Sequence, residues 1–186
     1  MNIQIAYNDW SSTYDRDRNL TRDLDREITR KILRDLPFKS AIEIGCGTGK
    51  NTIFLAEIAE KVHAIDFSEK MLEQALEKVN SGNVIFTLGD ITKPLPCRDR
   101  SADLITCNLV LEHIQNLAFI FSEANRILTK DGYLFISELH PFRQYRGTKA
   151  NFQREEDAIE IQAFIHHLSD FTTQAKNNNF MIDDFQ

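Results

Sequence analysis

The sequence predicts a doubly wound α/β fold, in which helices cover both faces of a mostly parallel sheet. Short runs rich in β-branched residues alternate with helical patterns along most of the 186 residues. Strands that alternate with helices in this way build parallel sheets. The composition, with 42% hydrophobic and 27% charged residues, is that of a folded globular protein. A chain of this length is expected to form a single domain over residues 1–186.

The domain is expected to have three parts: a helical cap at residues 1–37, a core at 38–139, and a lid with the C-terminal part at 140–186. In the cap, apolar residues recur at every fourth position, namely Leu20, Leu24, Ile28, Ile32 and Leu36. This spacing predicts an amphipathic helix over residues 20–36, with its Arg and Asp residues on a solvated face. Pro37 would end it.

The core is expected to alternate strands with helices. The predicted strands cover residues 41–44, 61–65, 84–88, 103–107 and 133–139. The predicted helices cover 50–60, 68–81 with Ser68 as N-cap, and 117–128, which a turn at 130–132 joins to the last strand. Polar residues and turn formers at 140–156 predict a long loop, which in a compact domain is usually a lid or binding loop. Residues 158–165 predict a strand and 169–178 a helix.

Charge and cysteine content narrow the function classes. With 22 basic and 28 acidic residues, the formal charge of −6 disfavours a nucleic-acid binder and favours small molecules or proteins as partners. The three cysteines contain no CxxC pair, so we expect neither a disulfide framework nor a metal site, and a reducing cytoplasm fits. No apolar run approaches roughly 20 residues and no basic segment precedes an apolar one at the start, which predicts neither a membrane span nor a signal peptide.

The densest motif is AIEIGCGTG at residues 41–49, a strand that leads into alternate glycines. Glycines allow a sharp turn and let a ligand lie against the backbone. A dinucleotide fingerprint would need glycine where Lys50 stands. A phosphate-binding P-loop would need glycine at Ile44 and Ser or Thr at Asn51. The pattern that remains is ExGxGxG.

This pattern resembles the first motif of class I S-adenosylmethionine-dependent methyltransferases, specifically the type 11-like group that acts on small molecules. Three further motifs follow in the family's order within about residues 41–139: VHAIDFS at 62–68, LGDI at 88–91 and ADLITCNLVLEH at 102–113. The resemblance implies a Rossmann-like fold, S-adenosylmethionine as cofactor and S-adenosylhomocysteine as product. It makes 38–139 the cofactor-binding core.

The resemblance also implies a set of cofactor-binding residues. The first motif supplies Glu43, Gly45, Cys46, Gly47 and Gly49. Asp66 would accept hydrogen bonds from the ribose hydroxyls, a geometry known from nucleotide-binding α/β sheets. Phe67 and Met71 would border the adenine, Asp90 and the backbone N–H of Ile91 would bind it, and Asn108 would lie near the methionine part.

The aromatic N-terminal segment resembles the one that covers the cofactor pocket in small-molecule members, including those that act on quinone and biotin precursors. Tyr14 is therefore a candidate contact for cofactor or substrate. The alternative is an ordinary N-terminal helix that packs its aromatic residues on the core.

The implied reaction is methyl transfer to a small-molecule acceptor by in-line displacement. The cofactor brings the reactive group, so the protein supplies alignment and, for some acceptors, a base. His113 and His140 follow strands at the carboxyl edge of the sheet and are the candidate catalytic bases. A carboxylic acid or an activated carbon would need no base. The cations Arg143, Arg146 and Lys149 would either attract an anionic substrate or lie on a solvated loop.

Two other function classes stay open: a non-catalytic module that binds a cofactor or a partner, and an NAD-dependent oxidoreductase, which Lys50 disfavours. The family's sheet ends with a sixth strand and an antiparallel seventh. Residues 180–185 (FMIDDF) predict the start of the sixth, so the C-terminal hairpin is expected to be incomplete. Either the chain is a shortened form, or another element covers the fifth strand's edge, such as a partner subunit in a homo-oligomer.

Overall fold

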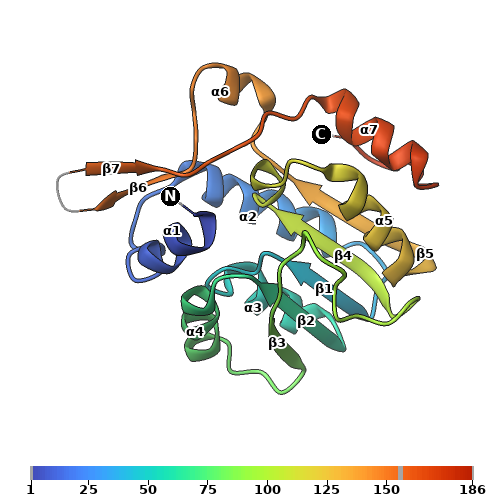
Figure 1. Cartoon of the computed structure of the whole chain (residues 1–186). Helices are drawn as coiled ribbons and strands as arrows, with labels where there is room; N and C mark the ends of the chain where they lie inside the picture. The colour runs from blue at the N-terminus through green and yellow to red at the C-terminus, as the bar shows by residue number, and fades with distance from the viewer. Residues whose placement is uncertain (1, 155–156, 186) are drawn as a thin grey trace.

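A five-stranded parallel sheet forms the centre of the protein (Figure 1). The structure is a computed structural model and describes residues 2–154 and 157–185. The strands are β1 (Ser40–Ile44), β2 (Lys61–Asp66), β3 (Val84–Leu88), β4 (Ala102–Asn108) and β5 (Leu128–Ser137), in the order β3-β2-β1-β4-β5. The order reverses between β1 and β4, and ligands of doubly wound sheets bind outside the carboxyl ends at this point. The predicted fold class is confirmed.

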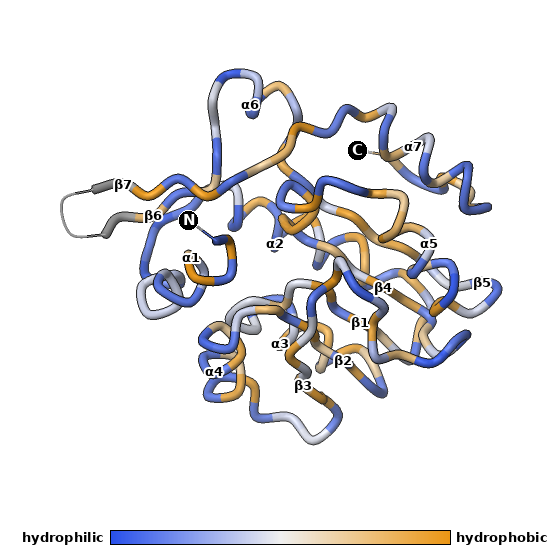
Figure 2. The backbone as a smooth tube through the Cα atoms, viewed as in Figure 1, coloured by the Kyte–Doolittle hydropathy of each residue, from blue (hydrophilic) through white to orange (hydrophobic). Residues whose placement is uncertain are grey.

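Helices cover both faces of this sheet. On one face, α2 (Leu20–Leu33), α3 (Lys50–Ile58) and α4 (Glu69–Lys78) pack against side chains such as Val62 and Ala64. On the other, α5 (Leu117–Ile127) and α7 (Leu168–Asn177) pack against Ile105 and its neighbours. Figure 2 shows hydrophobic residues concentrated along the strands, between these two helical layers.

The first half of helix α2 does not bury the apolar face that its sequence predicts, whereas Ile32 near its end packs against the core. Leu20 and Leu24 are 68% and 60% exposed, whereas Arg22, Asp25 and Thr29 are buried. The prediction that the charged residues of this helix form a solvated face is therefore wrong for its buried side. The physical reason is that this side of α2 lies against polar side chains at the carboxyl ends of the strands, rather than against an apolar layer.

The segment after β5 is more ordered than predicted. A short helix, α6 (Pro141–Tyr145), is followed by β6 (Asn151–Arg154) and β7 (Asp157–Glu160), which pair as an antiparallel hairpin. The predictions of a loop over 140–156 and a strand over 158–165 are thus wrong in their bounds. The hairpin is stabilised by distant contacts: Phe152 stacks on Trp10 of α1 (Ile3–Trp10) with ring centroids 5.4 Å apart, so the hairpin lies beside the N-terminal helix (Figure 1).

Residues 180–185 do not form the predicted sixth strand. The backbone N–H of Phe180 donates to the carbonyl of Ala175 and caps α7, and its ring contacts Phe121. Met181 is 94% exposed. A strand needs a neighbour for its backbone hydrogen bonds, and among the described residues only β4 pairs with β5. The turn predicted at 130–132 lies inside β5 as an irregularity, where pairing jumps from Leu128 to Tyr133.

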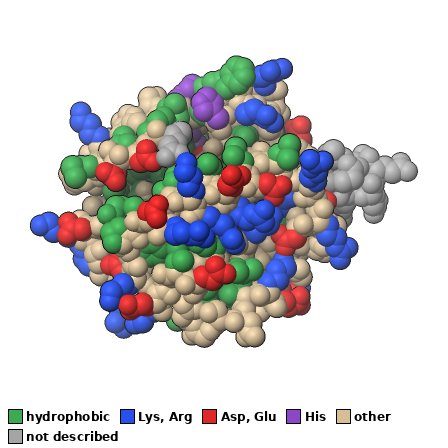
Figure 3. Space-filling view, turned by 180° about the vertical axis from the view of Figure 1, so that it is seen from behind, with side chains coloured by type: hydrophobic (Ala, Val, Ile, Leu, Met, Phe, Trp, Pro, Cys, Tyr) green, Lys and Arg blue, Asp and Glu red, His purple; other side chains and the backbone are tan. Residues whose placement is uncertain are grey.

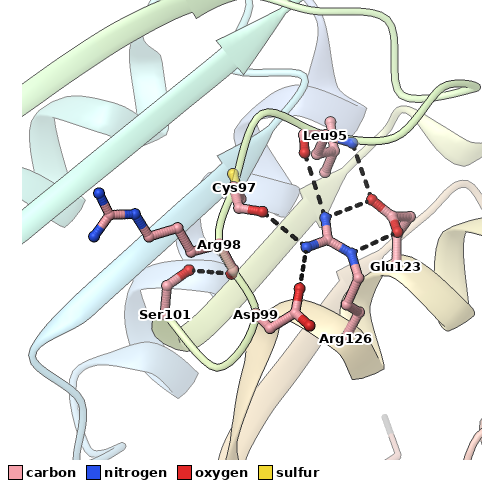
Figure 4. A network of polar contacts seen from close by, with 7 residues as sticks. All are labelled: Leu95, Cys97, Arg98, Asp99, Ser101, Glu123 and Arg126. Atoms are coloured by element: carbon pink, nitrogen blue, oxygen red, sulfur yellow. Dashed lines mark hydrogen bonds and ion pairs between the residues drawn. The ribbon is translucent and has the colours of Figure 1, made fainter.

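The connection from β3 to β4 is fixed onto α5 by one arginine (Figure 4). The guanidinium of Arg126 donates to Glu123 at 2.8 Å, to Asp99 at 2.7 Å and to the carbonyl of Cys97 at 2.8 Å. The backbone N–H of Leu95 donates to the same Glu123 carboxylate at 2.9 Å. These bonds anchor the loop that begins at residues 90–91, beside the site described below.

The surface mixes charges of both signs. Seen from behind, Lys and Arg side chains gather in a band that has Asp and Glu beside it (Figure 3). Within the described part of the chain, no helix is long and apolar enough to cross a membrane.

Candidate active site

A cavity of about 670 Å³ opens at the carboxyl edge of the sheet. Its volume lies in the range typical of small-molecule sites. Ten of the residues singled out from the sequence line it: Tyr14, Gly45, Gly47, Asp66, Phe67, Met71, Asp90, Ile91, Asn108 and His113. Four others, Glu43, Cys46, Gly49 and His140, are not among the lining residues. Segments from β1, β2, β4, α1 and the loop after β3 thus converge on one space.

The glycine-rich loop brings bare backbone to the cavity. Gly45 and Gly47 have φ angles of +73° and +53°, in the left-handed region that disfavours other residues. A Cβ atom at Gly45 would overlap the side chain of Val110, whereas one at Gly47 would meet nothing within 4 Å. Gly45 is therefore required by packing, and Gly47 leaves open space for a ligand.

Asp66 ends β2 with its carboxylate at the cavity and is 6% exposed. One oxygen accepts the backbone N–H of Gly47 and the other that of Ser68, both at 2.8 Å. A carboxylate offers about four acceptor positions, so capacity for two hydroxyl donors remains. Burial raises the pKa of Asp66, although hydrogen bonds from the backbone N–H groups of Ser68, Gly47 and Phe67 oppose the shift.

Asp90 starts the loop after β3. Its carboxylate accepts from the backbone N–H and hydroxyl of Thr92 at 2.9 and 2.6 Å, and Lys93 lies 3.3 Å away. Although partial burial opposes it, these partners hold the pKa of Asp90 below its ordinary value. Asp90 is thus ionised at neutral pH and keeps acceptor capacity at the cavity.

Asn108, at the end of β4, carries a buried acceptor without a partner. Its amide nitrogen donates to Asp25 at 2.7 Å and to Thr29 at 2.8 Å. Its Oδ1 is buried and has no hydrogen bond to the described residues. A buried polar atom left unpaired is costly, so a donor on a ligand in the cavity would stabilise this arrangement.

His113 is held by hydrogen bonds on both ring nitrogens. Nδ1 lies 2.7 Å from the carbonyl of Gln162, which can only accept, so this nitrogen carries the proton. In the neutral ring Nε2 is then the acceptor for the hydroxyl of Tyr7, 2.8 Å away. Burial raises the pKa of Tyr7 well above its ordinary value, so its hydroxyl stays protonated. Both rings line the cavity.

His140 lies elsewhere. It caps α6, and its Nδ1 accepts the backbone N–H of Phe142 at 3.1 Å. The cations Arg143, Arg146 and Lys149 are not among the cavity's lining residues either. The structure therefore gives His140 no place at the cavity, and among the described lining residues Lys93 is the one lysine or arginine.

Glu43 supports the glycine loop from inside. It is 3% exposed and accepts the hydroxyl of Thr52 at 2.5 Å. Burial raises the pKa of Glu43 to about 8, and the charges of Asp66 and Asp25 add to this. Its carboxyl group is therefore mostly protonated at neutral pH.

We expect Glu43→Gln to stabilise the protein at pH 8 but not at pH 4. Because the pKa of Glu43 rises from 4.5 to about 8 on folding, its contribution to stability is complete below about pH 4.5 and lost as pH rises to 8. The loss is at most ~1.4 kcal/mol per pH unit. Urea unfolding at several pH values checks this, with exposed Glu77→Gln as control. A difference between Glu43→Gln and wild type that does not change with pH would contradict it.

Several residues at the site were not predicted. Tyr7 and Gln4 come from α1, where Gln4 donates to the carbonyl of Phe67 at 2.6 Å. Gln162 comes from the segment after β7. The sequence signal for Tyr7 was its position in the aromatic N-terminal segment, whereas nothing in the sequence marks Gln162 or Asp25.

The sequence and the fold are matched among known proteins. The model of a family described as "Methyltransferase domain" matches residues 42–136. The chain belongs to this methyltransferase family. The resemblance to class I S-adenosylmethionine-dependent methyltransferases is thereby confirmed.

The relatives of this methyltransferase-family chain are distant. It is 29% identical to a demethylmenaquinone methyltransferase of Staphylococcus haemolyticus, over 73% of this chain and 60% of the relative. It is 28% identical to a malonyl-[acyl-carrier protein] O-methyltransferase of Bacillus cereus, over 86% of this chain and 60% of the relative. The chain thus spans about three fifths of the length of these curated relatives.

Solved structures share the fold. A complex of DhpI with S-adenosylhomocysteine superposes with a TM-score of 0.75 and 18% identity, over 95% of this chain and 85% of that one. An S-adenosylmethionine-dependent methyltransferase from Mesorhizobium loti superposes with a TM-score of 0.71 and 18% identity, over 88% of this chain and 84% of that one.

Among the described residues, no three His, Cys, Asp or Glu side chains are placed to hold a metal ion.

Proposed function

We propose that this chain binds S-adenosylmethionine in the cavity and transfers its methyl group to a small-molecule acceptor. The observation that carries the proposal is the placement of three features around one space: the spare acceptor capacity of Asp66, the open backbone at Gly47 and the unpaired oxygen of Asn108. They match, respectively, the ribose hydroxyls, a ligand that lies against the loop, and the ammonium group of the cofactor.

The remaining cofactor contacts follow from the same lining. Phe67 and Met71 offer apolar surface to the adenine ring, and Asp90 with the backbone of Ile91 offers an acceptor and a donor for its edge. Tyr14 also lines the cavity and is proposed to contact the cofactor or the substrate. Glu43, Cys46 and Gly49 would act through the loop's conformation rather than by contact. When bound, the cofactor supplies a methyl group that is already activated as a sulfonium.

The acceptor is proposed to lie against Tyr7 and His113. With Nδ1 bonded to the carbonyl of Gln162, His113 holds its Nε2 toward the Tyr7 hydroxyl, so a proton leaving the acceptor can pass to Tyr7 as the Tyr7 proton passes to His113. Lys93 is already paired with Asp90, which leaves the described residues of the lining without a free lysine or arginine to bind an anionic acceptor. We therefore favour an uncharged acceptor whose hydroxyl or amine loses a proton. Among the curated relatives, the demethylmenaquinone methyltransferase also supports, by its name, a small-molecule acceptor.

We expect Tyr7→Phe to lower kcat by about 100- to 1000-fold with such an acceptor, while affinity for S-adenosylhomocysteine changes less than twofold. The range is the lower part of what general base catalysis contributes. Steady-state kinetics and calorimetry check the two quantities. Exposed Tyr145→Phe, on α6, is the matched control. An unchanged kcat would remove Tyr7 from the proton path.

The experiment that tests the proposed function measures S-adenosylhomocysteine release from S-adenosylmethionine with a panel of phenols, quinols, amines and carboxylic acids. Turnover with at least one acceptor above the acceptor-free rate supports it. Binding of the cofactor without turnover on any panel member favours the non-catalytic module instead.

We also propose a reducing compartment such as the cytoplasm, since Cys46, Cys97 and Cys107 are all free.

A further inference from the structure

Helix α2 buries polar residues at a cost. It exposes Leu20 and Leu24 while it buries Asp25 and Thr29, which are 9% and 1% exposed. Burial of a carboxylate without a cationic partner is unfavourable, and the Asp25 carboxylate accepts hydrogen bonds from the neutral amides of Asn51 and Asn108. Departures from the expected pattern of burial concentrate at functional sites.

We propose that Asp25 is a positioning residue for the cofactor's methionine part, and the inference rests on the proposed function. Its carboxylate holds the amide of Asn108 in one orientation, with the nitrogen toward α2 and Oδ1 left for the cofactor's ammonium group. Asp25 itself does not line the cavity. It acts through Asn108, which does.

The orientation follows from donor and acceptor chemistry. The amide nitrogen of Asn108 donates to a carboxylate oxygen of Asp25 at 2.7 Å, so the NH2 group faces α2. The hydroxyl of Thr29 accepts from the same nitrogen at 2.8 Å. Both N–H donors of the amide are thereby used. The other atom of the amide group, Oδ1, is left as a buried acceptor without a partner among the described residues.

The chemical consequence is selectivity for one part of the ligand. An ammonium group donates to an amide oxygen but would be repelled by an amide NH2. If the amide of Asn108 were free to rotate, half of its orientations would present the wrong group. Asp25 removes that orientation, and so links the N-terminal helix α2 to recognition of the amino-acid end of the cofactor, not of its adenosine end.

The test compares two ligands by calorimetry. S-Adenosylhomocysteine carries the ammonium group, whereas 5′-methylthioadenosine shares the adenosine and thioether but lacks the amino acid. We expect Asp25→Ala to weaken S-adenosylhomocysteine by about tenfold or more and 5′-methylthioadenosine by less than twofold. Asp25→Asn keeps one oxygen for Asn108 and is expected to restore S-adenosylhomocysteine affinity to within about threefold of wild type. Exposed Asp23→Ala on the same helix is the control and changes neither.

Two further variants keep the inference falsifiable. Should Asp25→Ala not fold, Thr29→Val removes the other acceptor and is expected to weaken S-adenosylhomocysteine alone by a few-fold. In an Asn108→Ala background, Asp25→Asn and Thr29→Val are expected to add no further loss, since both residues act through Asn108. Equal losses for both ligands, or no loss for either, would overturn the inference. Failure of the wild-type protein to bind S-adenosylhomocysteine would instead overturn the proposed function.

Discussion

Replacement of Asp66 by alanine is expected to abolish measurable binding of S-adenosylhomocysteine. The carboxylate has capacity for two ribose hydroxyls and also fixes the backbone N–H groups of Gly47 and Ser68. Hydrogen bonds to a charged group contribute about 1.5–3 kcal/mol each. Loss of two corresponds to about a hundredfold to ten-thousandfold weaker binding. Isothermal titration calorimetry measures this directly.

The control for Asp66 is Glu73→Ala, which removes an exposed carboxylate from the neighbouring helix α4. It is expected to leave the affinity unchanged. Asp66→Asn tests the role of charge at constant shape, because it keeps one acceptor oxygen and is expected to bind more weakly than wild type but better than Asp66→Ala. An affinity of Asp66→Ala equal to that of wild type would refute the ribose assignment.

Gly45→Ala is expected to cause the largest loss of stability among single glycine changes. The new methyl group would overlap the side chain of Val110, and φ at this position is +73°. Overpacking costs about 1–3 kcal/mol and the left-handed conformation about 1–2 kcal/mol more. Together they correspond to a lower Tm by roughly 5–15 °C for a chain of this size. Thermal unfolding followed by circular dichroism gives the value.

Gly82→Ala provides the matched control, because a Cβ atom there meets nothing within 4 Å and its φ is not in the left-handed region. Its Tm is expected to stay within a few degrees of wild type. The double variant Gly45→Ala with Val110→Ala removes the overlap and is expected to recover part of the loss. A Gly45→Ala protein as stable as wild type would show that the loop can relax and that its geometry is not fixed by packing.

The sheet was predictable because its signals are local. Each of β1 to β5 is a short apolar run, and Ser68 caps α4 through a hydrogen bond within its own turn. Three segments were not predictable, because their structure depends on contacts with residues that are distant in the sequence. The hairpin of β6 and β7 depends on contact with α1, and residues 180–185 have no neighbouring strand within the described part of the chain. The buried side of α2 depends on a hydrogen bond between Asp25 and Asn108, which are 83 residues apart.

The candidate site divides in the same way. Parallel strands bring their carboxyl ends to one edge of the sheet. The sequence therefore placed the residues that lie at or just after the end of a strand, namely Gly45, Gly47, Asp66 and Asp90. Tyr7 and His113 could not be paired, since 106 residues separate them and their hydrogen bond depends on where α1 packs. His140 follows β5 as predicted, yet α6 directs it to a capping role.

The central claim is that the cavity is a site for S-adenosylmethionine and its product. Calorimetric titration of the wild-type protein with S-adenosylhomocysteine, and separately with NAD⁺, tests it most directly. We predict saturable one-to-one binding of S-adenosylhomocysteine and no binding of NAD⁺ at the same concentrations. Saturable binding of NAD⁺ without binding of S-adenosylhomocysteine would contradict the account and favour an oxidoreductase.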